Sequence, residues 1–443
     1  MAVPTGTLAT GVTRLLTIMG SGETSPTMVK MHRQLLGRLG RPPVPAVLLT
    51  TPFGFQMNAS DVAAKAVEYF RESVQAELQV ADIRSSADTD TVRNETMLAR
   101  LGDARYVFAG PGSPSYALRQ WTGTVVPQLL ADKLALGGAV TFASAAALTL
   151  GVSTVPVYEI YKVGADPFWL EGLDLLAATG LRAAVIPHYN NTEGGNHDTR
   201  YCYLGERRLA AMERDLPDDT FVLGVDEHSA LVMDLEGGDA TTAGLGVVTV
   251  RSRGRSTEIP SGTTIAISEI ADLAAERPAR SGRRRAGERT AAEEPVGAVA
   301  PDVGSSGSPL MDSVRAHEEA FACAVAERDV ESAVKAVLDL DQELQAWSRD
   351  TLQSDELDRG RAASRAMVVR LGQLAEVGAR DPRQVVGPFV EAVLGFRAEA
   401  RADGRWHDAD VARDRLAELG VEVRDGPNGT EWVLTGEPGR PAC

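Results

Sequence analysis

The stretch from Gly137 to Gly151 (Gly-Gly-Ala-Val-Thr-Phe-Ala-Ser-Ala-Ala-Ala-Leu-Thr-Leu-Gly) constrains the fold of this chain more than any other segment. It lies in a window without charged residues, between Lys133 and Glu159, that is long enough to raise the question of a membrane span. Ser, Thr, Gly and Pro interrupt this window, so we interpret it as a short buried strand, a sharp turn at Ser144 and a helix start. A serine at such a turn is lifted above the sheet edge, with the helix dipole behind it. The alternative is a small-residue packing site where the helix meets the sheet.

Strands and helices alternate before Ser144, which predicts an α/β fold with a doubly wound, mostly parallel sheet. The strands expected here are Leu15–Met19, Ala46–Thr51, Val80–Arg84 and Tyr106–Ala109. The loop Gly20-Ser21-Gly22-Glu23 follows the first of these strands, and Gly110-Pro111-Gly112-Ser113 follows the fourth. Ligands of such sheets bind beyond the carboxyl ends of the strands, so we expect both loops to converge with the Ser144 turn.

Further strands are expected after Ser144. Tyr158–Val163 carries Glu159, and Ala183–Pro187 delivers His188 at its carboxyl end. Two more strands, Phe221–Val225 and Ala230–Leu235, flank the turn Asp226-Glu227-His228-Ser229 and are expected to pair antiparallel. We place the whole α/β domain at residues 14–272.

The composition changes after Glu276. Residues Arg277–Pro309 are rich in Ala, Arg, Gly, Ser, Pro and Glu, which predicts a disordered linker over residues 273–311. Apolar residues at three- and four-residue spacing then predict a mainly helical domain over residues 312–443. The segments Val421–Arg424 and Trp432–Leu434 flank a Gly-rich turn, so we expect a small terminal hairpin.

Charge and cysteine content exclude several classes of function. The net charge of −16 over 443 residues disfavours broad affinity for nucleic acid or for an anionic membrane. The region from Asp312 onward has 17 Lys and Arg against 26 Asp and Glu, which weakens RNA binding through bulk electrostatics. Three scattered cysteines, Cys202, Cys323 and Cys443, do not suit a disulfide framework or a zinc site, so no metal or cofactor is expected. The start of the chain lacks a signal-peptide pattern, which favours a cytoplasmic location without a membrane partner.

Residues from about 14 to 268 resemble the dipeptidase E and cyanophycinase family of serine peptidases, which share the class I glutamine amidotransferase-like fold. The landmarks that carry the resemblance are Gly20-Ser21-Gly22-Glu23, the Gly110-Pro-Gly-Ser loop, Ser144-Ala145, Ile-Pro-His188 and Gly224-Val-Asp-Glu-His-Ser-Ala-Leu. The resemblance implies a Ser–His–acid triad, whose roles fall on Ser144, His188 and Glu159. Backbone N–H groups of Gly112 or Ser113 and of Ala145 would hold the oxyanion.

The nucleophile turn departs from the family pattern. The family has Gly-x-Ser-Ala-Gly, whereas this chain has Phe142-Ala143-Ser144-Ala145-Ala146. A phenylalanine in a crowded, strained turn must point away from the site or block it. The resemblance therefore leaves a weakened or lost hydrolase activity open.

Residues from about 385 to 434 resemble the C-terminal end of cysteinyl-tRNA synthetases. The matching segments are Phe396-Arg397-Ala-Glu-Ala-Arg401, Trp406-His-Asp-Ala-Asp410, Arg413-Asp-Arg-Leu-Ala-Glu-Leu-Gly420 and Asp425-Gly-Pro-Asn-Gly-Thr-Glu-Trp432. The catalytic motifs of the synthetase (His-Ile-Gly-His, Lys-Met-Ser-Lys-Ser and the zinc cysteines) are not found, so we interpret this part as a borrowed binding or scaffolding module.

The leading hypothesis is a serine hydrolase that cleaves a small peptide or amide, with an appended synthetase-like module. One alternative is a catalytically silent, amidotransferase-like binding protein. Another is a tRNA- or synthetase-associated protein, in which the C-terminal module binds tRNA weakly or binds a protein partner. The residues indicate neither the identity of the substrate nor the oligomeric state.

Overall fold

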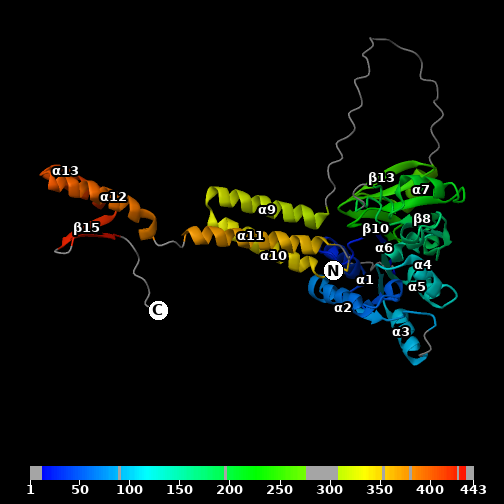
Figure 1. Cartoon of the computed structure of the whole chain (residues 1–443). Coiled ribbons are helices and arrows are strands. Elements are labelled where there is room, and N and C mark those ends of the chain that lie inside the picture. Colours follow the sequence, from blue (N-terminus) through cyan, green and yellow to red (C-terminus); the bar gives the residue numbers. More distant parts are fainter. Residues whose placement is uncertain are drawn as a thin grey trace, which may run out of the picture. The chain divides into compact units, whose positions relative to one another are not determined.

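The structure is a computed structural model that describes residues 12–87, 91–193, 197–275, 308–351, 355–378, 382–426 and 429–435 (Figure 1). These residues form two compact units. The first comprises the chain up to Ser313 together with Asp341–Gly360, and the second comprises Val314–Leu340 together with the chain from Arg361 onward. Most of the expected linker, residues 276–307, lies outside the described residues. The segment Asp341–Gly360 therefore belongs to the same unit as the α/β sheet, although it lies far along the chain.

An eight-stranded sheet forms the centre of the first unit. Its order is β14 (Thr264–Ala266), β11 (Asp239–Gly244), β10 (Ser229–Asp234), β1 (Arg14–Met19), β5 (Gly138–Ala143), β4 (Tyr106–Ala109), β2 (Ala46–Leu49) and β3 (Gln79–Ala81). The strands from β1 to β3 pair in parallel, whereas β10, β11 and β14 pair antiparallel. Met19 at the end of β1 is in register with Ala143 at the end of β5, so the loop after β1 starts beside Ser144.

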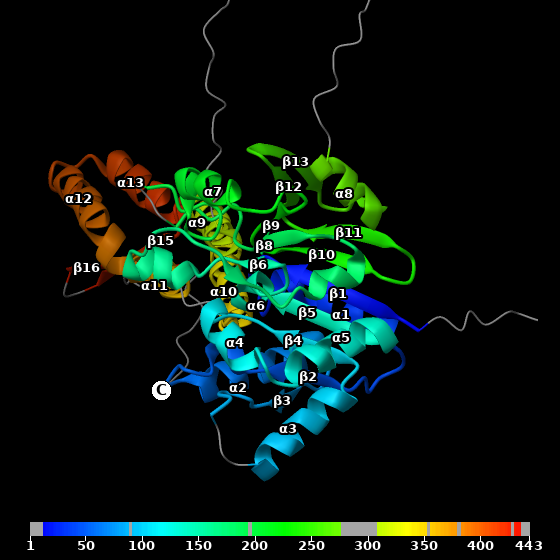
Figure 2. The same ribbon diagram turned by 90° about the vertical axis from the view of Figure 1, so that its right-hand side faces the viewer.

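Helices cover both faces of this sheet because its strands are apolar on both sides. One face packs against α1 (Val29–Leu39), α2 (Ala59–Tyr69) and the π-helical turn Phe70–Val74. The other face packs against α3 (Thr91–Asp103), α4 (Pro114–Trp121) and α5 (Val126–Leu136). Figure 2 shows α4 and α5 beside the strands β4 and β5. This arrangement confirms the α/β fold that the alternation of strands and helices predicted.

A second, six-stranded sheet completes the α/β part. Its order is β13 (Arg255–Pro260), β12 (Val247–Ser252), β9 (Phe221–Val225), β8 (Ala183–Ile186), β6 (Ser153–Thr154) and β7 (Leu170–Glu171). The expected pairing of Phe221–Val225 with Ala230–Leu235 is wrong, because β9 joins this sheet and β10 joins the first one. Strands β8 and β9 are parallel neighbours, with Ile186 in register with Gly224, so their carboxyl ends lie side by side.

The remaining helices of the first half are α6 (Ser144–Leu148), α7 (Gly205–Glu213) and α8 (Ile267–Ala275). Three long helices follow: α9 (Pro309–Glu327), α10 (Val330–Trp347) and α11 (Glu356–Gly378). In the second unit, α12 (Pro382–Ala402) and α13 (Trp406–Glu418) precede the hairpin of β15 (Val421–Gly426) and β16 (Gly429–Leu434), which confirms the expected hairpin. Val390, Leu394, Leu416 and Val421 form the small core of this module. Within the described ranges, no helix is long and apolar enough to cross a membrane.

Candidate active site

Ser144 occupies a sharp turn between β5 and α6. The preceding residue, Ala143, is extended, with φ of −125° and ψ of 156°, whereas Ser144 has a φ of +49°. A non-glycine residue at positive φ is strained and tends to mark a functional turn. The strand is buried along its whole length, and the backbone N–H of Ala146 donates to the carbonyl of Gly110 (3.1 Å). The turn is therefore held against the loop that follows β4.

Phe142 points away from this turn. Its side chain is fully buried and stacks on Trp121 of α4, with 5.8 Å between the ring centroids and 28° between the ring planes. Successive residues of a strand point to opposite faces, so the ring of Phe142 enters the core on the α4 side. Ala143 instead packs among the residues of the other face. The departure from the family's glycine is therefore accommodated by core packing and does not obstruct Ser144.

His188 lies beside Ser144, as the sequence predicted. Its Nε2 is 2.9 Å from Ser144 Oγ, and its Nδ1 is 2.8 Å from Oε1 of Glu227. An ionised carboxylate only accepts hydrogen bonds, so Nδ1 carries the proton and Nε2 of the neutral ring accepts from the serine hydroxyl. His188 follows β8 and Glu227 follows β9, the two parallel neighbours of the second sheet. The structure thus brings together Ser144, His188 and Glu227.

Glu159 is not part of this cluster, and its assignment as the acid partner of His188 is wrong. It lies in the π-helical turn Glu159–Val163, where a strand was expected. Ile160 donates its N–H to the carbonyl of Pro156, and Gly164 ends the turn at a φ of +85°. Its Oε2 is buried and has no hydrogen-bond partner among the described residues. Within this turn only Ile160 is buried, whereas Tyr158 and Val163 are exposed, so the segment lacks the buried face that a strand of the sheet would need.

Two asparagines of the loop after β8 hold Glu227 in place. The backbone N–H of Glu227 donates to Asn190 Oδ1 (2.8 Å), and Asn191 Nδ2 donates to Glu227 Oε1 (3.4 Å). The sequence showed an Asn-rich loop here but gave these residues no role. Their only sequence signal is their position at the carboxyl end of a strand, next to His188.

The pKa values of His188 and Glu227 are shifted in opposite directions by their interaction. Burial lowers the pKa of His188, but the hydrogen bond and the charge of Glu227 outweigh it, so the pKa lies above its usual value. Burial raises the pKa of Glu227, but the hydrogen bond and the charge of His188 outweigh it, so the pKa lies below its usual value. Glu227 is therefore ionised at neutral pH, and it favours a positive charge on the imidazole.

The sequence predicted that the backbone N–H of Gly112 or of Ser113 holds the oxyanion, and the structure distinguishes between these two donors. The N–H of Ser113 donates to the carbonyl of Pro52 (2.8 Å), and its Oγ accepts from the N–H of Tyr116 as the N-cap of α4. Ser113 is therefore excluded as an oxyanion donor, because its N–H is already bonded. Gly112 has a φ of +133°, and a Cβ added there would lie 2.0 Å from the carbonyl oxygen of Pro52. Only glycine fits this position, which fixes the loop close to the chain after β2.

The loop after β1 lies at the same edge of the sheet. Gly22 has a φ of +65°, and a Cβ there would lie 2.2 Å from Nδ1 of His228, the residue after Glu227. The carbonyl of Glu23 lies 2.7 Å from Nε2 of the buried His32. His32 Nδ1 lies 2.7 Å from the hydroxyl of Tyr106, and burial lowers the pKa of His32 to about 4. A neutral His32 thus fixes the backbone of this loop, and no sequence signal marked it.

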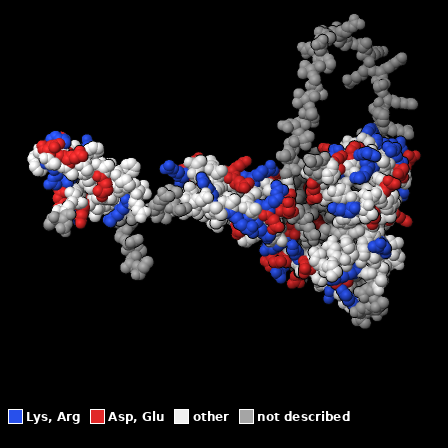
Figure 3. All heavy atoms as spheres, viewed as in Figure 1, with Lys and Arg blue, Asp and Glu red and all other residues white. Residues whose placement is uncertain are grey.

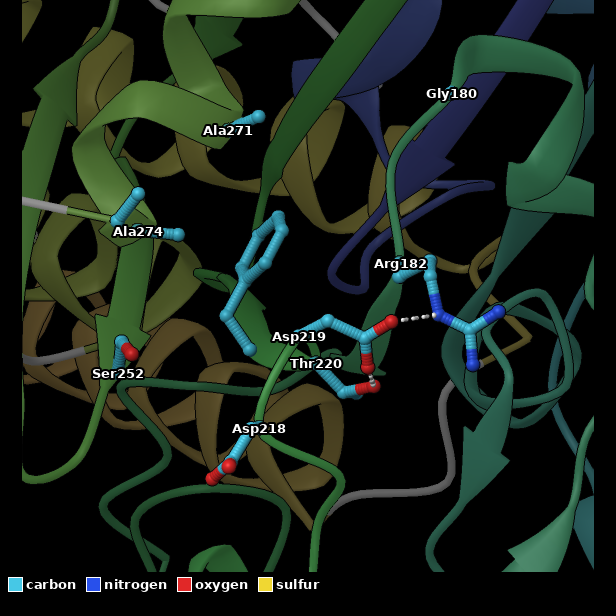
Figure 4. Close-up of a pocket in the computed structure, with 10 residues that line it drawn as sticks. Gly180, Arg182, Asp218, Asp219, Thr220, Ser252, Ala271 and Ala274 are labelled. Carbon is cyan, nitrogen blue, oxygen red and sulfur yellow. Dashed lines mark hydrogen bonds and ion pairs between the residues drawn. The ribbon is translucent and has the colours of Figure 1, made fainter.

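A separate pocket of about 190 Å³ lies away from this site (Figure 4). It is bordered by Arg182, Asp218 and Asp219, and an Arg182–Asp219 ion pair of 2.9 Å lies on its wall. Ser144, His188 and Glu227 do not line it. Its lining contains no histidine or cysteine, and its Thr220 hydroxyl donates to Asp219, which already pairs with Arg182, so we assign it no chemistry.

In the C-terminal module, which comprises α12, α13 and the terminal hairpin, acidic side chains form ion pairs with the arginines. Arg397 binds both carboxylate oxygens of Asp425 (2.9 and 2.6 Å), and Arg401 binds the same carboxylate (2.6 Å). Three further arginines of this module also pair with neighbouring acids: Arg405 with Asp403 and Asp408, Arg413 with Asp410 and Asp414, and Arg415 with Glu418. Figure 3 shows basic and acidic side chains interspersed on this module. These five arginines therefore do not form a stripe of unpaired positive charge.

Two solved structures resemble the chain over more than half of its length. A peptidase from an acI-B1 actinobacterium covers 58% of this chain and 97% of its own, with 20% identity and a TM-score of 0.47. A putative peptidase E protein from Listeria monocytogenes EGD-e covers 53% of this chain and 100% of its own, with 14% identity and a TM-score of 0.36. The assignment of Ser144, His188 and Glu227 rests on the geometry of this chain.

The family of the cysteinyl-tRNA ligase anticodon binding domain matches residues 386–432. A cysteine–tRNA ligase from Arthrobacter sp. (strain FB24) is 50% identical over 58 residues, which are 13% of this chain and 12% of that protein. A cysteine–tRNA ligase from Shewanella baltica (strain OS185) is 40% identical over 82 residues, which are 16% of this chain and 18% of that protein. The chain thus spans only 12% and 18% of the lengths of these two relatives, and its C-terminal module is similar to their anticodon-binding domain.

Proposed function

We propose that this chain is a serine hydrolase that cleaves a small peptide or amide. The observation that carries the proposal is the continuous hydrogen-bonded series of Ser144 Oγ, His188 and Glu227, with separations of 2.9 and 2.8 Å. A nucleophile, a base within hydrogen-bond reach and a carboxylate that orients the base are the elements of covalent acyl transfer. The strained φ of Ser144 supports the same function, because nucleophile turns expose the hydroxyl in this way.

In the proposed reaction, Ser144 Oγ attacks the substrate carbonyl carbon while its proton moves to His188 Nε2. Glu227 stabilises the resulting imidazolium through Nδ1. The imidazolium then gives the proton to the leaving amine, and an acyl-serine ester remains. Water attacks this ester with His188 again as the base, which releases the carboxylic acid and restores the serine hydroxyl.

The negative charge of the tetrahedral intermediate requires backbone donors close to Ser144. Ala145 supplies one, because the first N–H groups of a helix have no acceptor within the helix. Gly112 is the second proposed donor, since Pro111 has no N–H and the N–H of Ser113 is bonded to Pro52. The proposed oxyanion donors are therefore the N–H groups of Ala145 and Gly112, and Ser113, which the sequence also suggested, is left out.

Labelling with a fluorophosphonate that carries a fluorophore tests the proposal. The wild-type chain is expected to become covalently labelled at Ser144, because the oxygen of an activated serine attacks phosphorus, displaces fluoride and forms a phosphonate ester. Ser144→Ala should abolish labelling, and Glu227→Gln should slow it strongly. Glu159→Gln is the matched control and should label at the wild-type rate. A wild-type chain that stays unlabelled would favour the alternative of a catalytically silent binding protein.

A second proposed function concerns the C-terminal module, and the family match over residues 386–432 supports it. We propose at most weak, strongly salt-dependent binding of tRNA. Arg397 and Arg401 already form ion pairs with Asp425, so a phosphate backbone would have to compete with this carboxylate for both cations. A protein partner for this module is the alternative, and tRNA binding measured against salt concentration distinguishes the two.

A further inference from the structure

His228 directly follows Glu227, and its side chain is enclosed by other segments of the chain. The residue is buried, and its φ of +52° is a left-handed conformation that is strained for any residue other than glycine. Its Nδ1 lies 3.0 Å from Thr27 Oγ1 and 3.3 Å from Ser25 Oγ. A strained conformation of this kind persists only where the surroundings hold it. The shape of the turn that carries Glu227 therefore depends on how the ring of His228 is packed.

Trp347, at the end of α10, packs against this histidine. The two rings meet edge-on, with 5.6 Å between their centroids and 72° between their planes, which is a favoured arrangement for aromatic rings. Trp347 is also buried, and it belongs to the same compact unit as the α/β sheet. A residue from beyond the expected linker thus packs on the neighbour of the acid.

Hydrogen bonds to the loop after β1 hold Trp347 in place. Thr24 donates its hydroxyl to Asp350 Oδ1 (3.0 Å), and the backbone N–H of Thr351 donates to Thr24 Oγ1 (2.8 Å). The N–H of Asp350 in turn donates to the carbonyl of Trp347 (3.0 Å), so the anchored residues and the tryptophan form one turn. Thr24 and Thr351 are buried, which shields these bonds from water. The position of the Trp347 ring is therefore set by contacts on both sides of it.

The carboxylate of Glu227 needs an exact position to orient the base. Its Oε1 lies 2.8 Å from His188 Nδ1. The chain around it is held before and after the side chain, because the N–H of Glu227 donates to Asn190 (2.8 Å) and the carbonyl of His228 accepts from Leu245 (3.0 Å). A misplacement of about 1 Å in a catalytic arrangement costs on the order of a hundredfold in rate. Freedom of the His228 ring would therefore be felt by the site through Glu227.

We propose that Trp347 is a positioning residue for Glu227. Its ring holds His228 and thereby keeps the neighbouring carboxylate in hydrogen-bond contact with His188. The proposal rests on the proposed hydrolase function, because it concerns the acid of that site. In this arrangement the α/β domain of residues 14–272 is not sufficient for a fully ordered site, since a residue from beyond the linker fixes the acid.

The rate of fluorophosphonate labelling of the full-length chain tests this role in a double-mutant cycle. Trp347→Ala is expected to slow the labelling of Ser144 by about ten- to a hundredfold, because the acid loses its fixed orientation. In a Glu227→Gln background, the same substitution should change the rate by less than about twofold, since no carboxylate is left to orient. A purely structural role of Trp347 would instead lower the rate equally in both backgrounds.

Three further variants separate positioning from general destabilisation. Trp347→Phe keeps an aromatic edge against the histidine and should restore most of the rate. Thr24→Val keeps the shape of the threonine but removes its hydrogen bonds to the end of α10, so it should slow labelling in the same direction, even if Trp347→Ala does not fold. Trp406→Ala is the matched control, because this tryptophan of the C-terminal module is 62% exposed, and it should label at the wild-type rate.

Titration of the His188 ring, followed by NMR, gives a readout that needs no activity. The hydrogen bond and the charge of Glu227 hold the pKa of His188 above its usual value, so Trp347→Ala should move the midpoint to lower pH, as Glu227→Gln does. An unchanged midpoint in Trp347→Ala, or equal losses of labelling in the two backgrounds, overturns the positioning role. A lowered midpoint in a protein whose wild-type Ser144 resists fluorophosphonate would keep the positioning of Glu227 and refute the hydrolase.

Discussion

Oε1 of Glu227 lies 2.8 Å from Nδ1 of His188, although the two residues are 39 positions apart. Each follows the carboxyl end of a strand, and these two strands, β8 and β9, are parallel neighbours. Asn190 and Asn191 add hydrogen bonds to Glu227 from the adjoining loop. The orientation of the imidazole therefore depends on the sheet itself, which holds base and acid in a fixed register.

Glu227→Gln should lower kcat/KM by about 10²- to 10⁴-fold, since it removes the charge that stabilises the imidazolium. Glu159→Gln is expected to leave kcat/KM within about twofold of wild type, because the two ring nitrogens of His188 are bonded to Ser144 and Glu227 and not to Glu159. Steady-state hydrolysis of an activated ester by both variants measures the difference. Equal losses in the two variants would contradict the assignment of the acid.

The pH dependence of kcat/KM should report the ionisation of His188. Only the neutral imidazole accepts the serine proton, so activity is lost as the pH falls through the pKa of His188. Glu227 raises this pKa despite burial, and the midpoint is expected above the usual value of 6.5. Glu227→Gln removes the raising contribution and should move the midpoint of its residual activity to lower pH. A midpoint that is unchanged in this variant would argue against the coupling of the two groups.

The sequence predicted Ser144 and His188, which lie together in the structure, but not Glu227, the carboxylate that contacts His188. Ser144 and His188 were marked by local features, a small-residue turn after a buried strand and a strand that ends in Ile-Pro-His. Glu159 and Glu227 were both acids near strand ends, and only the sheet order decides which one is close to His188. That order is set by long-range pairing of β8 with β9, for which the local pattern carries no signal. Glu227, the acid of the candidate site, could therefore not be predicted from the spacing of residues along the sequence.

Phe142 shows a similar limit for the fold. The sequence posed the alternative that its ring blocks the site or points away, and the outcome depends on Trp121 of α4, which lies 21 positions earlier. The five parallel strands of the first sheet and the terminal hairpin followed from local patterns of apolar residues and turns, whereas β11 (Asp239–Gly244) was not predicted. Two other features depend on packing between segments that are distant in the sequence. These are the division of β9 and β10 between two sheets and the hydrogen bond from Thr24 to Asp350.

Phe142→Ala should destabilise the protein by about 3–5 kcal/mol, because it empties a fully buried site and removes the stacking on Trp121. Phe389→Ala is the control, since that ring is 74% exposed, and its effect should stay within about 0.5 kcal/mol. Urea unfolding followed by circular dichroism measures both. A mild effect of Phe142→Ala would mean that the core at this position is loosely packed.

Glu23 should make the folded state less stable as the pH rises. Its pKa is raised from 4.5 to about 7, so the folded state binds the proton more tightly than the unfolded chain does. Stability is then greatest below pH 4.5 with respect to this group, and it decreases as the pH rises through 7. Glu23→Gln removes the effect, and its stability relative to wild type should increase between pH 5 and pH 8 by up to about 3 kcal/mol. The exposed Glu72→Gln is the control, and parallel curves for Glu23→Gln and wild type would contradict the prediction.

Transfer RNA should bind the full-length chain weakly, with a dissociation constant above about 10 μM at 200 mM salt, a value typical of nonspecific contacts. The physical reason is that Arg397 and Arg401 share the carboxylate of Asp425, so a phosphate must compete with an ion pair that is already formed. Binding should strengthen steeply at 50 mM salt, by on the order of a thousandfold if six phosphates are contacted. Asp425→Asn removes the competing charge, and it should increase the affinity for tRNA at each salt concentration, whereas Asp218→Asn in the first unit should not. Filter binding across the salt series measures all three proteins, and sub-micromolar binding by the wild-type chain at 200 mM salt would show that these ion pairs open readily for RNA.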